Sequence, residues 1–255
     1  MTDVNGEQQC FICTEPMKIV AVGECEHRIC HVCSLRLRAL YKNNHCAYCK
    51  TEQAWVIFSE DPLREYSSFG ENEPACVDAT LGIRYQHQET FAESTRLLKL
   101  ACPKDGCSDV VGHWAKLKAH VRDEHRLSFC DLCCKYKKAF AHEHQLFTRN
   151  QLRDHYRGVS REPSEGFRGH PECGFCKQNF YDDDQLYEHC RDRHEQCHLC
   201  VRAGVGRQQY YRNYKELEGH FNQDHFPCMY EACLESKFVV FSTDIDLKAH
   251  EVSGQ

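Results

Sequence analysis

Residues 10–49 read CFICTEPMKIVAVGECEHRICHVCSLRLRALYKNNHCAYC. The side chains in this stretch that are typical zinc ligands are Cys10, Cys13, Cys25, His27, Cys30, Cys33, Cys46 and Cys49. Each of the three CxxC pairs suits a turn that directs two thiolates at one ion, and Cys25 with His27 supplies a fourth pair. Eight such ligands make two closed tetrahedral zinc sites, which leave no open position for catalysis and are therefore structural. The spacing alone does not decide whether the pairs combine sequentially or interleave.

The ligand order, with eleven residues between Cys13 and Cys25 and twelve between Cys33 and Cys46, resembles that of the RING finger family. The resemblance implies interleaved pairing, in which Cys10, Cys13, Cys30 and Cys33 bind one zinc and Cys25, His27, Cys46 and Cys49 bind the other. RING fingers bind a ubiquitin-conjugating enzyme charged with ubiquitin and have no nucleophile of their own. The resemblance therefore implies catalysis by positioning, with no catalytic residue in this chain.

Carried over by position, the resemblance also implies a groove for the conjugating enzyme. That groove would use Ile12, between the first two ligands, and Leu37, on a short helix expected within SLRLRAL (residues 34–40). Lys50 follows the last ligand, where many RING fingers place a basic residue that contacts ubiquitin and the enzyme together. Ala47 stands where the family often has Pro, and Leu37 where it often has an aromatic residue. The alternative is that Ile12 and Leu37 belong to the core of a small domain.

The composition indicates small metal-stabilised modules. The chain has 255 residues, of which 20 are Cys and 17 are His. Modules of a few tens of residues bury too little apolar surface to fold unaided, and cysteines accompanied by histidines favour metal over disulfides. Only Cys76, Cys134 and Cys190 fall outside the expected ligand groups. Because the sequence shows no signal-peptide pattern and no apolar run of membrane-spanning length, we expect a cytoplasmic protein without a membrane partner.

An internal repeat follows residue 102. The tetrapeptides LKAH, LRDH, LYEH, LEGH and LKAH end at His120, His155, His189, His220 and His250. In a helix, a Leu three residues before a His lies on the same face, so the Leu can pack a small core while the imidazole binds an ion. The pattern resembles the C2H2 zinc finger, in which a hairpin carries two Cys and a helix carries two His.

Five fingers are expected, over residues 102–125, 130–170, 173–194, 197–225 and 228–255. Their ligands are Cys102, Cys107, His120 and His125; Cys130, Cys133, His155 and His170; Cys173, Cys176, His189 and His194; Cys197, Cys200, His220 and His225; and Cys228, Cys233 and His250. In finger two, His142 or His144 could replace His170. Finger five lacks a fourth ligand, which we expect beyond Gln255. The sequence thus predicts two zinc ions in the RING and four in complete fingers, with a further site in finger five.

The expected fold is a series of small zinc-stabilised α+β modules, a RING finger followed by a compact array of ββα fingers. The RING is expected over residues 1–58, closed by a strand at AWVIF (residues 54–58). Residues 59–101 are expected to form a linker and a small strand-containing platform. Spacers of two residues separate later fingers, such as residues 171–172 and 195–196, and should hold neighbouring fingers in fixed contact rather than let them follow a DNA groove.

Basic residues interleave with aromatic residues in two places. We expect RNA or ribosome contacts from Lys135, Lys137, Lys138, Arg149, Arg153, Arg157, Arg161, Arg207 and Arg212. Exposed cations beside aromatic rings suit phosphate contacts and base stacking on irregular RNA. The alternative is a solvated surface over aromatic cores. A formal net charge of −6 argues against a protein that simply coats DNA.

The order of a RING finger, a small linker region and a compact finger array, with RGHPECGFC (residues 168–176) and STDIDLKAH (residues 242–250), closely resembles the RING and zinc-finger ubiquitin ligases that sense collided ribosomes. The resemblance implies ubiquitination of small-subunit ribosomal proteins in ribosome-associated quality control. It implies a charged conjugating enzyme and the ribosome, including ribosomal RNA, as partners. Two alternatives remain open: a nucleic-acid-binding zinc-finger protein, or an adaptor whose RING is only structural.

Overall fold

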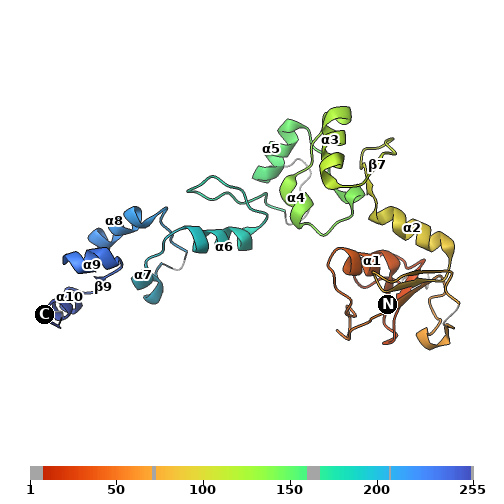
Figure 1. Ribbon diagram of the computed structural model, residues 1–255, viewed down its shortest axis with the longest axis horizontal. Helices are drawn as coiled ribbons and strands as arrows, with labels where there is room; N and C mark the ends of the chain where they lie inside the picture. The colour runs from red at the N-terminus through yellow and green to blue at the C-terminus, as the bar shows by residue number, and fades with distance from the viewer. Residues whose placement is uncertain (1–7, 71–72, 160–166, 207, 254–255) are drawn as a thin grey trace. The chain divides into compact units, whose positions relative to one another are not determined.

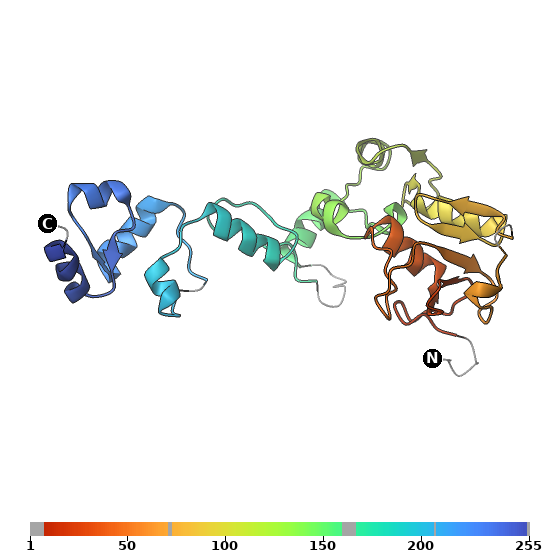
Figure 2. The ribbon, with the colours of Figure 1, turned by 60° about the horizontal axis from the view of Figure 1, so that its bottom comes forward.

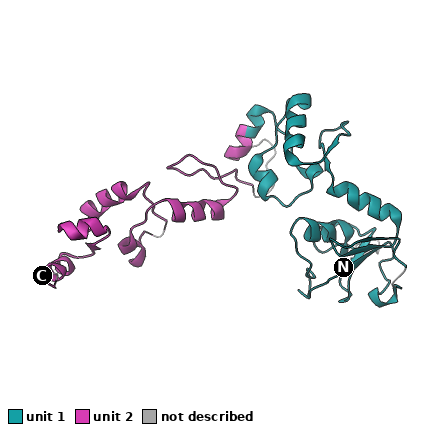
Figure 3. Cartoon of the chain, viewed as in Figure 1, with its two compact units in different colours: residues 1–152 teal, residues 153–255 magenta. Residues whose placement is uncertain are grey.

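The structure is a computed structural model that describes residues 8–70, 73–159, 167–206 and 208–253. The chain divides into two compact units, residues 1–152 and residues 153–255, which Figure 3 colours separately. None of the helices in the described ranges is long and apolar enough to cross a membrane.

Unit 1 begins with a five-stranded sheet whose strand order is β2-β1-β3-β5-β4 (Figure 1). Its strands are β1 (Val20–Val22), β2 (Arg28–Cys30), β3 (Val56–Ser59), β4 (Cys76–Asp78) and β5 (Ile83–Tyr85). The helices beside it are α1 (His31–Ala39), α2 (Gln88–Leu98) and the 3-10 turn η1 (Tyr66–Ser68). Figure 2 shows α2 lying along this sheet. Helix α1 covers residues 34–39 of the segment 34–40 in which a helix was expected, and β3 overlaps the expected closing strand at residues 56–58.

The structure places part of the expected linker inside the first module. Strand β3 pairs in parallel with β5, with Val56 opposite Ile83, and β5 pairs antiparallel with β4. Buried Phe58 and Tyr85 meet edge to face at 5.3 Å between ring centroids, and Phe91 of α2 packs on Tyr85 at 5.2 Å. The boundary expected at residue 58 is therefore wrong as a structural division, because β4 and β5 lie beyond it and belong to the same sheet as β3. A parallel pair such as β3 and β5 needs a long connection, and residues 60–82 supply it.

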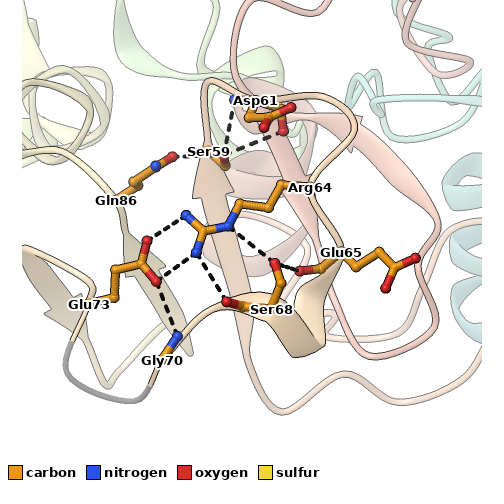
Figure 4. Close-up of polar contacts among 8 residues, drawn as sticks. All are labelled: Ser59, Asp61, Arg64, Glu65, Ser68, Gly70, Glu73 and Gln86. Atoms are coloured by element: carbon orange, nitrogen blue, oxygen red, sulfur yellow. Dashed lines mark hydrogen bonds and ion pairs between the residues drawn. The ribbon is translucent and has the colours of Figure 1, made fainter.

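The segment that follows β3 is organised by Arg64 (Figure 4). Its guanidinium forms two hydrogen bonds with the Glu73 carboxylate and donates to the Ser68 carbonyl oxygen at 3.1 Å. The Arg64 partner lowers the pKa of Glu73 below its ordinary value. Arg64 also lies over the Phe69 ring at 3.9 Å from its centroid. Polar contacts of Arg64 therefore give this segment a defined conformation, although the sequence predicts a linker here.

The same segment supports the loop that carries two expected ligands. The Tyr66 amide donates to Glu26 Oε1 at 2.8 Å, and Arg28 donates to the Arg64 carbonyl oxygen at 3.0 Å. Glu26 has a left-handed φ of 60° and lies between Cys25 and His27. Contacts from residues 64–66 thus help to fix the conformation of the β1–β2 loop.

Helix α1 is attached to the sheet by Arg38. Its side chain is buried, and its guanidinium donates to the carbonyl oxygens of Leu81 at 2.8 Å, Ala54 at 3.4 Å and Gln53. A buried cation is tolerated only when its donors are satisfied, and these carbonyls satisfy them. Gly82 has a φ of 64°, and a Cβ there would lie 2.1 Å from the Ala54 carbonyl oxygen. The turn that presents these acceptors therefore requires glycine.

The rest of unit 1 contains finger one and the first half of finger two. Its elements are β6 (Leu100–Ala101), β7 (Val110–Val111), α3 (Trp114–His125), α4 (Asp131–Tyr136), the 3-10 turn η2 (Ala141–Glu143) and α5 (Arg149–Arg157), which continues into unit 2. Strands β6 and β7 pair antiparallel before α3, so finger one has the expected ββα order. Leu117 and Val121 of α3 are fully buried in the core of this finger, one turn apart.

One aromatic side chain from the finger-two segment is inserted into the core of the sheet module. Phe140 is 2% exposed and packs in the same hydrophobic cluster as Leu35 of α1 and Tyr85 of β5. The Arg36 guanidinium lies over its ring at 5.1 Å and pairs with Glu143. The other Glu143 carboxylate oxygen accepts from the Phe140 amide at 2.7 Å. We call Arg36, Phe140 and Glu143 the Phe140 joint; it attaches the finger-two segment directly to α1.

Unit 2 contains short strands and helices. Its elements are α6 (Asp183–Arg193), α7 (His198–Arg202), α8 (Tyr214–Asp224), β8 (Phe226–Pro227), α9 (Glu231–Ser236), β9 (Val240–Phe241) and α10 (Asp244–Ser253). Asp182 caps α6 by accepting from the Gln185 amide at 2.9 Å, and Asn213 caps α8 by accepting from the Glu216 amide at 3.1 Å. Side-chain acceptors at these positions explain where the two helices begin.

Fingers two, four and five depart from the simple ββα pattern. Their second cysteines, Cys133, Cys200 and Cys233, lie on the short helices α4, α7 and α9 rather than in a hairpin turn. In finger four, Cys197 precedes the helix and its Sγ accepts from the Cys200 amide at 3.4 Å. A CxxC turn can therefore continue as a helical turn, which the ligand spacing alone does not reveal.

Removing the buried ring of the Phe140 joint should destabilise the sheet module. We expect Phe140→Ala to lower its free energy of unfolding by about 3–5 kcal/mol, because the substitution leaves a cavity in a packed core. Urea unfolding at fixed excess zinc, followed by circular dichroism, measures the change. Phe11→Ala is the matched control: Phe11 is 49% exposed, and its loss should cost about 0.5 kcal/mol or less. Equal costs for the two substitutions would contradict the burial of Phe140 in this core.

Candidate metal centres and recruitment surface

The first eight candidate ligands form two groups in the structure. One group contains Cys10, Cys13, Cys30 and Cys33, and the other contains Cys25, His27, Cys46 and Cys49. Within each group, the ligand atoms all lie within 4.8 Å of one another. The arrangement is the interleaved one. In chain order, the first and third pairs of ligands form one group, and the second and fourth pairs form the other.

Local backbone geometry directs these thiols inward. The Thr14 amide donates to the Cys10 carbonyl oxygen at 2.7 Å, and Thr14 has a left-handed φ of 61°. The second group repeats this turn: the Lys50 amide donates to the Cys46 carbonyl oxygen at 3.0 Å, and Lys50 has a φ of 62°. Cys33 lies on α1 and its amide donates to Cys30 Sγ at 3.4 Å. Two hairpin turns, the β1–β2 loop, and the end of β2 with the start of α1 therefore supply the four pairs.

The spacing of the ligand atoms fits zinc. A tetrahedral ion with Zn–S of about 2.3 Å and Zn–N of about 2.0–2.1 Å separates its ligand atoms by about 3.3–3.8 Å. In the first group, Cys13 Sγ lies 3.7 Å from Cys30 Sγ. In the second group, His27 Nδ1 is buried and has no hydrogen-bond partner in the described part of the chain. An orphaned ring nitrogen beside three thiols is what a metal ligand requires.

Fingers one and three assemble the complete sets predicted from the sequence. In finger one, Cys107 Sγ lies 3.3 Å from His120 Nε2, which lies 3.2 Å from His125 Nε2. In finger three, Cys173 Sγ lies 3.2 Å from His194 Nε2, and Cys176 Sγ lies 3.3 Å from His189 Nε2. These separations match the range for ligands of one tetrahedral zinc.

Fingers four and five show similar distances between ligand atoms, but finger four has four ligands and finger five has three among the described residues. His225 Nε2 lies 3.2 Å from both Cys197 Sγ and Cys200 Sγ, and His220 Nε2 lies 3.4 Å from Cys200 Sγ. In finger five, Cys233 Sγ lies 3.3 Å from His250 Nε2, and Cys228 is buried.

The ligands expected for finger two are divided between the units: Cys130 and Cys133 lie in unit 1, and His155 and His170 lie in unit 2. The two imidazoles face each other, with 3.2 Å between their Nε2 atoms.

The two alternative ligands for finger two have other surroundings. His144 is buried, with its ring edge to face against Trp114 at 5.3 Å between centroids, and burial lowers its pKa. His142 stacks on Phe140 at 5.9 Å. Of the alternatives that the sequence leaves open, the structure therefore favours His170 as the partner of His155.

The second ring nitrogen of several histidines has a defined partner. The Nδ1 atoms of His120 and His220 lie 3.3 Å and 2.8 Å from the carboxylates of Asp109 and Asp224, respectively. A ligand histidine usually donates its free N–H to a carboxylate or a carbonyl, which fixes its tautomer and orientation. These contacts leave Nε2 of each ring for the metal.

Two of these partners link successive fingers within unit 2. His170 Nδ1 lies 3.1 Å from the Tyr181 carbonyl oxygen in finger three, and His194 Nδ1 lies 3.2 Å from the Arg212 carbonyl oxygen in finger four. If Nε2 binds the metal, Nδ1 carries the proton and donates it to that carbonyl. The last ligand of one finger therefore also orients the next finger, which supports the fixed contact expected from the short spacers.

Fingers four and five share one core. Val240 of β9 is buried in the same cluster as Leu217 and Phe221 of α8. Phe238 packs edge to face on Tyr214, with 5.2 Å between ring centroids. Neither finger is therefore an independent folding unit, because each completes the other's apolar core.

The expected recruitment residues differ in exposure. Ile12 is 43% exposed, in the turn between Cys10 and Cys13, whereas Leu37 is half-buried and lines a hollow with Asn43 and Ala47. Lys50 is exposed, and its Nζ donates back to the Ala47 carbonyl oxygen at 3.0 Å. Of the two expected groove residues, only Ile12 is presented openly to a partner.

Two exposed aromatic residues were missed by the sequence analysis. Phe11 and Tyr48 are 49% and 67% exposed and meet edge to face at 5.9 Å between ring centroids. Tyr48 also stacks on His27 at 4.5 Å. Each occupies a middle position of a CxxC pair, and such residues point outward when the cysteines point inward. That position in the motif is the signal that could have found them.

The basic residues lie in separate places. Arg149, Arg153 and Arg157 are exposed on α5 at intervals of four, which places them along one face of the helix. Lys135, Lys137 and Lys138 are exposed at the end of α4 and just after it. Arg212 is exposed before α8, while Arg161 and Arg207 lie outside the described residues.

The spare cysteines do not resemble catalytic nucleophiles. Burial raises the pKa of Cys134 to about 11 and also raises the pKa of Cys190. The Cys76 thiol donates to Gln88 Oε1 at 2.7 Å. A nucleophilic cysteine needs a lowered pKa, so neither Cys134 nor Cys190 supplies a thioester-forming site.

Comparisons with known families agree with these modules. Residues 5–96 match the family described as the ZNF598 RING finger domain, and residues 193–251 match a C2H2-type zinc finger. Fold and clusters together define a RING and C2H2 zinc-finger protein that binds zinc. The RING match extends over β4, β5 and most of α2, in agreement with the single sheet.

Curated relatives place the chain more closely. It is 46% identical over 251 residues to the E3 ubiquitin-protein ligase hel2 of Schizosaccharomyces pombe, which covers 96% of this chain and 34% of that protein. It is 38% identical to HEL2 of Saccharomyces cerevisiae, over 94% of this chain and 37% of the relative, and 31% identical to human ZNF598, over 96% and 26%. The chain is thus similar over nearly all of its length to the Hel2 and ZNF598 E3 ubiquitin-protein ligases, and it spans between 26% and 37% of the length of these three relatives.

Replacing one thiolate of the first group should remove zinc and unfold the sheet module. A structural zinc site contributes about 10–16 kcal/mol to a small module, so Cys30→Ser should abolish most of that stabilisation. Elemental analysis of zinc and far-ultraviolet circular dichroism measure the two effects. Cys76→Ser, outside both groups, should retain the zinc and the fold. A Cys30→Ser protein with its full zinc content would argue against this ligand assignment.

Proposed function

We propose that this chain carries the ligase part of a RING-type E3 ubiquitin-protein ligase. The observation that carries the proposal is the exposed apolar cluster of Phe11, Ile12 and Tyr48, borne on turns that the two ligand groups hold rigid. An exposed apolar patch on a small metal-stabilised module is typical of a protein-binding surface. The names of the homologous relatives support a ubiquitin-conjugating enzyme as the partner.

The chemistry proceeds on the conjugating enzyme. A substrate lysine amine attacks the thioester carbonyl that joins ubiquitin to that enzyme, an amide bond forms, the carbon–sulfur bond breaks and the enzyme thiolate leaves. The ligase contributes by holding the thioester and the amine in a reactive geometry. Leu37 would contact the conjugating enzyme beside Ile12, and Lys50 would swing from Ala47 to contact ubiquitin.

Zinc has a structural role in this proposal. The RING would hold two ions and the complete fingers four, with finger five contributing three ligands to a further site. Each thiolate or imidazole fixes a turn or a helix end, so zinc keeps the recruitment surface and the fingers in shape. Closed four-ligand sets leave no position for a reactive water.

The fingers would dock the ligase on ribosomes, where small-subunit ribosomal proteins of stalled or collided ribosomes would be ubiquitinated in the cytoplasm. The arginine stripe of α5, formed by Arg149, Arg153 and Arg157, supports contact with ribosomal RNA phosphates, because arginine makes bidentate bonds to phosphate. The linked finger geometry of unit 2 supports recognition of a shaped surface rather than a linear sequence.

Charged substitutions at the recruitment surface test the ligase reaction. We expect Ile12→Arg and Leu37→Arg each to lower ubiquitin chain formation about tenfold or more, since breaking a central contact of an interface costs about 2 kcal/mol or more. Reconstituted assays with a panel of conjugating enzymes measure the rate. Val77→Arg, at an exposed position of edge strand β4, is the control and should retain full activity. Unchanged activity in both Ile12→Arg and Leu37→Arg would contradict this recruitment surface and favour the alternative, an adaptor whose RING is only structural.

Charge reversal on α5 tests ribosome docking separately. Arg149→Glu with Arg153→Glu should weaken cosedimentation with ribosomes about tenfold and reduce its salt dependence, because phosphate contacts are lost. Ribosome-independent chain formation should not change. A control with Arg122→Glu and Arg191→Glu removes the same charge elsewhere. Equal binding by both variants would show that α5 does not face RNA.

A further inference from the structure

A groove lies along the seam between the core of the sheet module and the core of finger one. Its apolar floor is formed by half-buried Leu40, Leu97, Leu98, Leu100 and Trp114. Leu40, Leu97 and Leu98 pack against the sheet-module core, whereas Leu100 and Trp114 pack against that of finger one. We call this feature the seam groove; it lies entirely within unit 1 and has a volume of about 210 Å³.

Lysines form the rim of the seam groove. Lys135, Lys137 and Lys138 all line it, and each is exposed. The acidic residues that flank this segment in the chain have other partners, since Asp131 pairs with Lys118 and Glu143 pairs with Arg36. The rim therefore offers positive charge to an incoming group.

The walls of the groove are held in place before any partner binds. Phe140 also lines the groove, and its ring is buried in the sheet-module core. The ion pair between Arg36 and Glu143 holds the same segment against α1. A preformed groove costs little ordering entropy when it is filled, which favours its use as a binding site.

The size and lining of the groove select the occupant. Pockets for cofactors and drug-sized ligands have volumes of about 300–1,000 Å³, so this one suits one or two bulky side chains of a peptide. The leucine side chains of the floor offer no hydrogen bonds to the polar edges of a nucleotide base, whereas they suit an apolar side chain of a peptide. The lysines of the rim would attract the carboxylates of a peptide and the phosphates of a nucleic acid alike. The apolar floor therefore favours a peptide over a nucleic acid as the occupant.

We propose that the seam groove binds an acidic peptide segment of a partner protein. A Leu or Phe side chain of that segment fills the floor beside Trp114, and its carboxylates lie against Lys135, Lys137 and Lys138. This site is separate from the conjugating-enzyme surface of Phe11, Ile12 and Tyr48, and its occupancy does not require ligase activity.

Trp114 provides a direct readout of binding. The chain has two tryptophans, so Trp55→Phe leaves Trp114 as the only indole. The probe is a nine-residue synthetic peptide of Glu and Asp around a central Leu-Phe pair. Titration into the zinc-loaded protein should shift Trp114 emission with a Kd of about 1–100 μM, the range of weak peptide docking. The same peptide with Ser-Ser at its centre should bind at least about tenfold more weakly, because it cannot fill the floor.

Matched charge variants locate the site. Replacing Lys135, Lys137 and Lys138 with Glu should weaken binding about tenfold or more. The control variant makes the same change in charge away from the groove, at Lys104, Lys116 and Lys215, and should bind normally. Zinc content and circular dichroism establish that both variants fold. Nine-nucleotide uridylate is the competing probe. A Trp114 response to the RNA but not to the peptide, equal binding of the Ser-Ser peptide, or no response to either probe would each overturn the proposal.

Discussion

Closure of each ligand set around a metal ion is the constraint on which the rest of this protein depends. The turns at Cys10–Cys13 and Cys46–Cys49 contain left-handed backbone at Thr14 and Lys50, and they present Phe11, Ile12 and Tyr48 outward because their cysteines point inward. Without metal, buried thiols and an orphaned His27 nitrogen would face one another at a cost. The outward presentation of Phe11, Ile12 and Tyr48 is therefore a consequence of metal binding and not an independent feature.

The metal sites are joined by ordinary packing into larger pieces. Phe140 enters the core beneath α1, and the Nδ1 contacts of His170 and His194 bind each finger to the carbonyl of the next. In unit 1 this arrangement places the finger-two segment against the helix that carries Leu37. Within unit 1, the metal-held turns, α1 and the finger-two segment are therefore held together by packing and an ion pair.

The sequence predicts best what depends on local spacing. Local ligand spacing predicted which residues of the RING segment are ligands, the ligand sets of fingers one and three, and the helix that follows Cys30, since each ligand pair lies within a few residues. The interleaved grouping of the RING ligands was implied by the family resemblance, because spacing alone leaves it open. The parallel pairing of β3 with β5 and the insertion of Phe140 are contacts between distant segments, and no local pattern marks them. Short helices after Cys130, Cys197 and Cys228 were missed because a short segment between two cysteine ligands suits a hairpin and a helix alike.

Hydrogen exchange of the protein during stepwise removal of zinc by a chelator tests this dependence most directly. We expect amides of β1, β3 and β5 to lose protection together with the Phe140 segment, at the chelator concentration that releases zinc from the first two ligand groups. The turns that present Ile12 and Tyr48 should lose protection at the same step. A sheet that remains protected after its zinc has left would rule out this dependence, because packing alone would then hold the turns that present Ile12 and Tyr48.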